Sequence, residues 1–478
     1  MISADRRGRQ NSSWGAAALL VGLLLGGAAL RLYNINWDLF RQLHPDERAI
    51  AMFAAPLSLP LPPNWANLLD AKTSTLNPHF FAYGSFTIYL LRLASWVAAL
   101  FDPRLGSYEY LSPIGRVISA LFDLGTIGLL YLLGSRLYGR AAGLLAAAFV
   151  TFTAFHIQLS HFYAADTLLT FALVLALVFA EQLRRRGRLR DAVGLGAAIG
   201  LAFAFKFSAL PALLLPVVAA GLYIYWPRPG EQGWRRPASR QVNRSIGLVA
   251  LCCLAAVVVG VVLQPYAVLD FATYVRSISE QNAMVRGLAD LPYTRQYAGT
   301  TPYLYFLRNL VLWGYGPALG LTALAGITYL AVRQFVRPRA TDLLLLAWVV
   351  PYFLVTGSFY AKFMRYLLPI MPALSLAGAV LVVDLYRWLA ARQADGTNLW
   401  RARLLSPYGA VGLGGAALLG AVLYGAAFIN VYSGEHPRLA ASQWLYENVT
   451  AGSVITSEHW DDPLPLPMQI DGRQRRLD

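Results

Sequence analysis

Four ionisable side chains lie within five consecutive positions of "QLHPDERAI", residues 42–50: His44, Asp46, Glu47 and Arg48. A carboxylate can take a proton from an attacking hydroxyl group, and a neighbouring cation can stabilise an anionic leaving group. The motif directly follows the first apolar segment, so we expect both carboxylates to meet water and to stay ionised. Asp46 and Glu47 are therefore candidate catalytic residues.

Another carboxylate, Asp166, opens a later apolar segment within "HIQLSHFYAADTLLTF", residues 156–171. An acidic residue at a helix start also caps free backbone N–H groups, so a purely structural role is the alternative. His156 and His161 lie nearby, but their spacing does not indicate a particular metal. We expect helix packing to bring Asp166 close to Asp46 and Glu47 at one boundary of a membrane.

Cations also occur at the ends of apolar segments. The chain has three lysines against 37 arginines, and two of the lysines lie in "LAFAFKFSALP" (201–211) and "GSFYAKFMRYLLPIMP" (357–372). Placing a cation within a bilayer costs free energy, and such cations are usually paired with anions. This favours a binding site for a lipid phosphate. Snorkelling toward lipid headgroups is the alternative. The candidate substrate-binding residues are His44, Arg48, Lys206, Lys362, Arg365 and Tyr366.

The composition indicates which elements must hold these residues. The chain has 478 residues, of which 57% are hydrophobic and only 14% are charged, with a mean hydropathy of +0.48. Soluble proteins average about 25% charged residues. Apolar runs of about 20 residues, each long enough to cross a membrane as a helix, recur along the chain. The composition predicts an all-α polytopic membrane protein.

The positive charge is typical of membrane topology and does not indicate a nucleic-acid partner. The net charge of +15 comes largely from short arginine-rich connectors, which are expected to face the cytoplasm and anionic lipids. Placing all of these connectors inside predicts eleven spans at residues 13–33, 113–136, 140–160, 163–183, 191–208, 209–227, 246–266, 303–333, 342–358, 363–388 and 404–430. Residues 80–100, with Arg92 near their centre, are predicted to form an interfacial helix. A twelfth crossing is the alternative.

This topology divides the chain into two parts. We expect residues 1–430 to form a transmembrane catalytic domain whose outer loops are 34–112 and 267–302. The second loop is either a lid or acceptor-binding element over the site or a plain interfacial connector. Residues 431–478 form an extracytoplasmic segment with a helix at 436–449 and a strand at 452–460. This segment is too short to close a core, so we expect a truncated α/β unit. The connectors and arginine usage are typical of a prokaryotic plasma membrane protein.

One charged pair inside the membrane has no expected catalytic role. Asp123 lies within a predicted span, and Arg116 precedes it by two helical turns. We expect these residues to form a structural ion pair, with Arg92 as a further partner.

The order of these motifs resembles the GT-C glycosyltransferases, in particular protein O-mannosyltransferases and lipid-A aminoarabinose transferases. The acidic pair in the first outer loop, "SHFYAAD", "FAFKFSAL" and "KFMRYLLPIMP" carry the resemblance, which covers about residues 13–430. The resemblance implies that Asp46 is the catalytic base, with Glu47 as its neighbour and Asp166 as the second acidic motif. It also implies that Lys206 and Arg365 lie near the carrier phosphate. Some members hold a divalent cation and others do not, so Mg²⁺ or Mn²⁺ between Asp46 and Asp166 stays open.

The resemblance implies a transferase whose donor is a sugar linked to a polyprenyl phosphate. The acceptor would be a hydroxyl or amine of a glycan, lipid or protein on the extracytoplasmic side of the membrane. The charges alone permit the same reaction, because one carboxylate can activate the acceptor while cations stabilise the departing phosphate. The sequence contains no P-loop or Rossmann glycine pattern. A transporter or lipid flippase, or a polymerase or ligase of surface polysaccharide, is the alternative.

Overall fold

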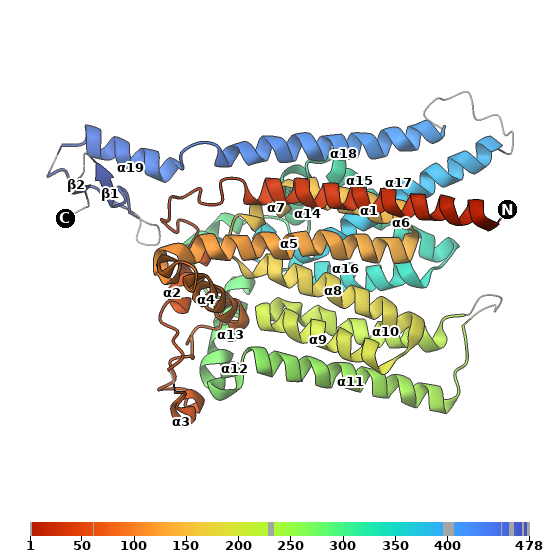
Figure 1. The fold of residues 1–478 in the computed structure, drawn as a ribbon, viewed down its shortest axis with the longest axis horizontal. Helices are drawn as coiled ribbons and strands as arrows, with labels where there is room; N and C mark the ends of the chain where they lie inside the picture. The colour runs from red at the N-terminus through yellow and green to blue at the C-terminus, as the bar shows by residue number, and fades with distance from the viewer. Residues whose placement is uncertain are drawn as a thin grey trace.

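Apolar segments of the chain fold as helices, because a helix satisfies its backbone hydrogen bonds within the segment. A computed structural model describes residues 2–60, 62–227, 234–394, 406–450, 452–457, 463–470 and 473–475. Figure 1 shows the long helices lying side by side in one bundle. They are α1 (Ile2–Leu32), α5 (Tyr108–Tyr138), α6 (Arg140–Phe152), α7 (Ala154–Ser160), α8 (Ala165–Arg186), α9 (Leu189–Phe205), α10 (Leu214–Tyr225), α11 (Ser239–Leu263), α15 (Pro317–Val336), α16 (Ala340–Gly357), α17 (Met371–Ala394) and α18 (Pro407–Ile429).

Short helical pieces extend or connect these helices. Those within the bundle are η2 (Phe207–Leu213), α14 (Leu304–Asn309), η4 (Leu310–Tyr315) and η5 (Met364–Ile370). Those beyond its end are α2 (Pro45–Ala54), α3 (Trp65–Leu69), α4 (Ser85–Ala99), η1 (Pro103–Gly106), α12 (Tyr266–Leu269), α13 (Phe271–Arg286), η3 (Pro292–Tyr297), η7 (Asn430–Tyr432) and α19 (Pro437–Asn448).

The lengths of the helices agree with a protein that crosses a membrane many times. In the part of the chain that the structure describes, nine helices are long and apolar enough to cross, and α6 with α7, bent by 59°, gives a tenth. Helix α9 has 17 residues and packs along α8 and α11. Together these segments overlap the eleven predicted spans, but the span predicted at 303–333 is wrong in its first part, because residues 304–315 form α14 and η4 and the long helix begins at Pro317. The prediction of an all-α polytopic membrane protein is confirmed.

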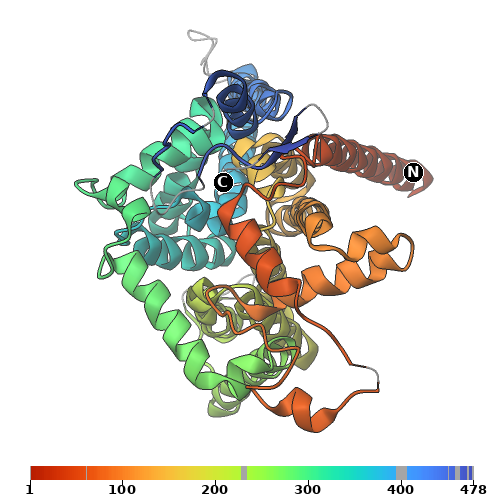
Figure 2. The same ribbon diagram turned by 90° about the vertical axis from the view of Figure 1, so that its left-hand side faces the viewer.

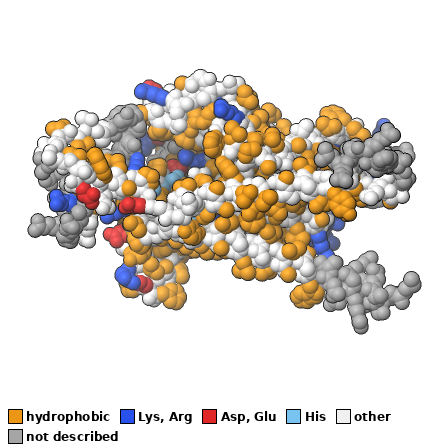
Figure 3. All heavy atoms as spheres, turned by 90° about the horizontal axis from the view of Figure 1, so that it is seen from above, with side chains coloured by type: hydrophobic (Ala, Val, Ile, Leu, Met, Phe, Trp, Pro, Cys, Tyr) orange, Lys and Arg blue, Asp and Glu red, His pale blue; other side chains and the backbone are white. Residues whose placement is uncertain are grey.

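The two ends of the bundle carry different elements. We call the end that carries α2, α4, α12, α13 and α19 the site end. The arginine-rich connectors between α5 and α6, α8 and α9, and α15 and α16 lie at the opposite end (Figure 1). Figure 3 shows apolar side chains over the middle of the bundle, while most charged side chains on that face lie toward the ends.

Helix α4 lies across the site end. It has 15 residues, fewer than the roughly 20 that a membrane crossing needs. Figures 1 and 2 show it running across the ends of the long helices. The guanidinium of Arg92 donates hydrogen bonds to the carbonyl oxygens of Leu57 and Gly106, at 3.0 and 3.2 Å. These contacts tie α4 to the loops on both sides of it and agree with the predicted interfacial helix.

The centre of the bundle is formed by α8 and α17, whose most apolar windows are largely buried inside the protein. Helix α8 packs against α5, α9, α10 and η5, and α17 packs against α6, α15 and α18. Close packing of α15 on α17 requires a glycine, because a Cβ atom on Gly326 would lie 2.3 Å from the backbone nitrogen of Gly378. The central position of α8 and η5 holds the side chains at their site ends in fixed places.

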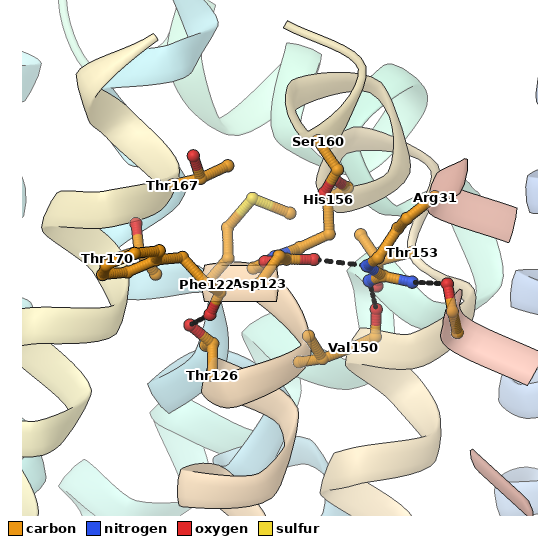
Figure 4. Close-up of polar contacts among 12 residues, drawn as sticks. Arg31, Phe122, Asp123, Thr126, Val150, Thr153, His156, Ser160, Thr167 and Thr170 are labelled. Carbon is orange, nitrogen blue, oxygen red and sulfur yellow. Dashed lines mark hydrogen bonds and ion pairs between the residues drawn. The ribbon is translucent and has the colours of Figure 1, made fainter. Parts of the chain in front are cut away.

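The expected pairing of Asp123 with Arg116 is wrong. Figure 4 shows that Asp123 accepts a hydrogen bond from Arg31 of α1, with a distance of 2.7 Å from Nε to Oδ2. His156 Nδ1 lies 2.7 Å from the other carboxylate oxygen. Arg116 and Asp123 are seven residues apart on one helix, roughly 10 Å along its axis, so each side chain contacts different neighbours.

The C-terminal segment packs on the first loop at the site end. The helix predicted at 436–449 is confirmed as α19, and β1 (Met468–Ile470) pairs antiparallel with β2 (Arg473–Arg475). The strand predicted at 452–460 is wrong for residues 452–457, which form no strand; residues 458–460 lie outside the described residues. Strand-like residues need a partner to form a ladder. The guanidinium of Arg41 donates to the carbonyl oxygen of Pro467 at 2.6 Å.

Candidate active site

Helix α2 presents the acidic pair of the first loop. His44 is the N-cap, and its Nδ1 accepts a hydrogen bond from the backbone N–H of Glu47 at 3.4 Å. Pro45 occupies the first helical turn, where its missing N–H leaves no unmade hydrogen bond. Successive residues of a helix are rotated by about 100°, so Asp46 and Glu47 point in different directions. Asp46 lines a cavity, whereas Glu47 points into the protein interior.

Asp46 contacts one hydroxyl group and one guanidinium group. Its Oδ1 accepts a hydrogen bond from the Tyr83 hydroxyl at 2.8 Å, and its Oδ2 lies 3.1 Å from Arg365 Nη2. Burial alone would raise the pKa of Asp46. The charge of Arg365, followed by His44 and the Tyr83 hydrogen bond, outweighs burial and lowers this pKa below its usual value. Asp46 is therefore an ionised carboxylate.

Asp166 lies on the other side of Arg365. It occupies the first turn of α8, and its Oδ1 accepts a hydrogen bond from Lys206 Nζ at 2.8 Å. Its Oδ2 lies 4.0 Å from Arg365 Nε. The structure thus brings Asp46 and Asp166 to the same guanidinium group. Lys206 Nζ also lies 5.2 Å from the ring centre of Tyr366, where the aromatic face stabilises the ammonium charge.

Tyr83 is held in place by the packing of its loop on the end of α9. The backbone N–H of Gly84 donates to the carbonyl oxygen of Phe205 at 2.9 Å. A Cβ atom on Gly84 would lie only 2.0 Å from the carbonyl oxygen of Ala204, so only glycine permits this approach. Burial, together with the charge of Asp46, raises the pKa of Tyr83 well above its usual value. The hydroxyl group stays protonated and donates to Asp46.

Glu47 belongs to a buried ion cluster behind the cavity. Arg116 Nη2 lies 2.7 Å from both Glu47 Oε2 and Asp38 Oδ2, and Glu47 Oε1 accepts from the backbone N–H of Tyr163 at 3.2 Å. Burial raises the pKa of Glu47 to about 7, against the opposing charge of Arg116. The expectation that both members of the acidic pair meet water is wrong for Glu47, whose exposed fraction is 1%. The helix that exposes Asp46 turns Glu47 inward.

A cavity of about 580 Å³ opens beside these residues. It receives side chains from α2, the loop before α4, the end of α9, α13, η3, η5 and α19. Its size is within the range of small-ligand sites. The residues that line it are Leu43, Pro45, Asp46, Arg48, Tyr83, Lys206, Gln281, Met284, Tyr293, Phe363, Arg365, Tyr366 and Arg438.

Several of the predicted site residues lie away from the cavity lining. His44 caps α2, and its ring stacks on Phe162 with ring centres 4.1 Å apart. Burial lowers the pKa of His44 to about 4. Lys362 is buried, with its Nζ donating to the carbonyl oxygen of Tyr360 at 3.1 Å, and burial lowers its pKa. Asp166 contacts the lining residues Lys206 and Arg365 from behind.

Sequence reasoning missed other residues of the site. Tyr83 precedes the glycine that packs against α9, but a single tyrosine in a loop rich in aromatic residues gives no distinguishing signal. Residues 267–302, predicted as a lid, an acceptor-binding element or a plain connector, contain α13 and η3 and contribute Gln281, Met284 and Tyr293 to the cavity lining. The missed lining residues are Leu43, Pro45, Tyr83, Gln281, Met284, Tyr293, Phe363 and Arg438.

Comparisons with known proteins agree with this architecture. Residues 93–259, about a third of the chain, match the profile of a family described as dolichyl-phosphate-mannose-protein mannosyltransferase. A search of curated proteins found no match. The Archaeoglobus fulgidus oligosaccharyltransferase AglB, crystallised with an inhibitory peptide and a dolichol-phosphate, is similar in structure with a TM-score of 0.54 at 18% identity. That alignment covers 92% of this chain and 59% of AglB.

A transferase from another organism gives a similar result. ArnT from Cupriavidus metallidurans, bound to undecaprenyl phosphate, aligns with a TM-score of 0.54 at 17% identity, over 92% of this chain and 81% of ArnT. The chain has the fold of the GT-C glycosyltransferases. The resemblance predicted from the sequence is thus confirmed at the level of the fold. The chain spans just under three fifths of the length of AglB.

Proposed function

We propose that the protein is a membrane glycosyltransferase that moves a sugar from a polyprenyl phosphate to an acceptor hydroxyl or amine. The observation that carries this proposal is the arrangement of Asp46, Arg365, Asp166 and Lys206 at one cavity. AglB and ArnT, which share the fold, have been crystallised with dolichol phosphate and undecaprenyl phosphate respectively. A lipid phosphate is a donor whose leaving group matches the cations at this cavity.

The reaction is a single displacement at the anomeric carbon of the sugar. The acceptor oxygen or nitrogen attacks this carbon while the bond from carbon to phosphate oxygen breaks, and the electron pair leaves with the carrier phosphate. Attack from the side opposite the phosphate inverts the configuration of the sugar. The acceptor proton passes to Asp46 Oδ2, which lies 3.1 Å from Arg365 Nη2 as an ion pair but accepts no hydrogen bond from the described residues.

The other charged residues near the cavity act on the departing phosphate or position its neighbours. Lys206 and Arg365 stabilise the departing phosphate, since both present N–H donors to the same cavity. Asp166 acts as a positioning residue, because it accepts from Lys206 at 2.8 Å and lies next to Arg365. Glu47 is also a positioning residue, since its ion pair with Arg116 fixes the first turn of α2. Arg48, the residue after Glu47, lines the cavity and contributes to substrate binding.

The site faces the extracytoplasmic side of a plasma membrane in this proposal. The arginine-rich connectors lie at the end of the bundle opposite the cavity (Figure 1), and such connectors favour the cytoplasm. The donor carrier then lies in the outer leaflet, and a glycan, lipid or protein outside the cell serves as the acceptor. A transporter would place its polar residues near the middle of the membrane, whereas these charged residues gather at one end.

The experiment that tests the proposal incubates purified protein with a panel of polyprenyl-phosphate sugars and detects products by mass spectrometry. Asp46→Asn should lower the transfer rate by about 10²–10⁴-fold, the range of general base catalysis. Glu280→Gln, at an exposed acid of α13, is the matched control and should leave the rate unchanged. Full activity of D46N would remove Asp46 from the mechanism. Absence of product from every donor, with movement of lipid across vesicles instead, would favour a flippase.

A further inference from the structure

The acidic residues of this site are occupied in a way that does not suit a metal ion. A structure of A. fulgidus oligosaccharyltransferase with the same fold holds zinc, with a TM-score of 0.51 to this chain. A cation bound between the two acids of this site would need the carboxylate oxygens of Asp46 and Asp166. All four of these oxygens already face a hydrogen-bond donor or a positive charge.

The contacts of the two carboxylates are complementary. Asp46 Oδ1 accepts from the Tyr83 hydroxyl at 2.8 Å, and Asp166 Oδ1 accepts from Lys206 Nζ at the same distance. Arg365 faces the remaining oxygens, with Nη2 at 3.1 Å from Asp46 Oδ2 and Nε at 4.0 Å from Asp166 Oδ2. The guanidinium therefore lies between the two acids, which is where a bridging cation would have to bind.

The neighbouring residues do not complete a ligand set either. Glu47 is held by Arg116, and His44 directs Nδ1 toward the N–H of Glu47. Within the described residues, no group of three or more His, Cys, Asp and Glu side chains is arranged to hold a metal. The charges balance without a metal, because two carboxylates face one ammonium and one guanidinium. A divalent cation added here would be repelled by both cations.

We propose that Arg365 and Lys206 take the place of a divalent cation and that the transfer reaction needs no metal. This inference rests on the proposed glycosyl transfer and assigns its electrophilic group. Arg365 is suited to the role because its buried Nε has no hydrogen-bond partner among the described residues. Its guanidinium can donate two parallel hydrogen bonds to phosphate oxygens. The leaving phosphate gains the contacts that a metal supplies in other enzymes.

The test compares activity and metal binding in the full chain. Purified protein dialysed against EDTA should transfer sugar at a rate within about twofold of the untreated protein, and added Mn²⁺ or Mg²⁺ should change it by no more than that. Arg365→Gln should lose on the order of 100-fold in rate, as expected for the loss of one preorganised charged donor. Loss of activity in EDTA with recovery in Mn²⁺, or full activity of R365Q, would overturn the inference.

A binding measurement makes the test independent of the donor. Calorimetric titration of the EDTA-treated protein with Mn²⁺ should show no saturable binding that depends on Asp46. Saturable binding in the unaltered chain that disappears in D46N would overturn the inference even when no donor is known. Failure of the proposed function gives a different result, namely no transfer by the untreated protein with any donor. E280Q serves again as the control for removal of an acid from the site end.

Discussion

At the scale of single residues, two adjacent acids have different surroundings. Asp46 faces a cavity with a side-chain exposure of 14%, while Glu47 is enclosed by Arg116 and the backbone of Tyr163. The two oxygens of the Asp46 carboxylate also differ in their contacts. Oδ1 accepts a hydrogen bond from the Tyr83 hydroxyl, and Oδ2 faces Arg365. Orientation of a base by a neighbouring donor is a recurrent feature of acid–base sites.

Removal of the Tyr83 hydroxyl should change both the rate and its pH dependence. The hydrogen bond from Tyr83 lowers the pKa of Asp46, so Tyr83→Phe should raise this pKa. Asp46 then becomes protonated at a higher pH, so the acidic side of the pH–rate profile shifts to a higher pH. We expect kcat to fall on the order of tenfold, the loss of one hydrogen bond to a charged group, with little change in KM for the donor.

The measurement is the pH dependence of initial rates of the proposed transfer for Y83F and the unaltered protein. Phenylalanine fills the same volume, so packing against α9 is retained and Phe at this position isolates the hydroxyl group. An unchanged acid limb in Y83F would show that Tyr83 does not orient the proposed base, Asp46. Tyr293→Phe, at another tyrosine that lines the cavity, is the matched comparison and should leave the limb in place.

At the scale of elements, the start of α2 determines where the acids point. The neutral ring of His44 accepts the Glu47 N–H, and the two acids in the first turn interact favourably with the helix dipole. The ring of His44 also stacks on Phe162, which lies directly before α8. This contact joins the start of α2 to the segment that leads to Asp166.

The His44 cap should make stability depend on pH in a defined direction. The pKa of His44 is about 4 in the folded protein, below its usual value of 6.5, because burial disfavours the charged ring. The unfolded chain binds a proton as the pH falls below about 6.5, while the folded chain does not until about pH 4. Stability is therefore lost over this window, by at most about 3 kcal/mol.

Replacement of His44 by asparagine distinguishes the effect of ring protonation from the effect of the N-cap hydrogen bond. His44→Asn retains an acceptor for the Glu47 N–H but does not titrate. The difference in melting temperature between the unaltered protein and H44N should shift in favour of H44N as the pH falls from 6.5 to 4. His44→Ala should be less stable than H44N throughout. A difference that does not vary with pH would show that His44 is not the titrating group.

At the scale of the whole molecule, the bundle separates two kinds of charge. The mixed acidic and basic cluster lies at the site end, together with α4, α13 and α19, and the arginine-rich connectors lie at the other end (Figures 1 and 2). Helices α8 and η5 pack together in the centre of the bundle. They bring Asp166 and Arg365 together although 199 positions separate them in the chain. The membrane then determines which compartment each end meets.

Cysteine labelling tests which compartment this is. Cys252 and Cys253 are first replaced by alanine, and a single cysteine is introduced at Glu280 of α13 or at Leu189, the first residue of α9, both exposed positions. A membrane-impermeant maleimide applied to intact cells should label Glu280→Cys and not Leu189→Cys. The reverse pattern would place the cavity in the cytoplasm and exclude an extracytoplasmic acceptor.

The sequence by itself determined the helical segments and the end of the bundle at which the candidate site residues gather. A long apolar run must form a helix to satisfy its backbone in lipid, and the interruptions by charged connectors mark its ends. The start of α2 at Pro45 also depends on local residues, although no helix was predicted there. These features depend on neighbouring residues only, so the sequence contains them.

Only the tertiary structure decided which charged groups meet. Arg116 pairs with Glu47 and Asp38, not with Asp123, and Tyr83 contacts Asp46 although no motif distinguishes it. Each pairing depends on how a helix is rotated about its axis and on which neighbour packs against it. Buried charges must find partners wherever packing places them, and those partners come from distant parts of the chain.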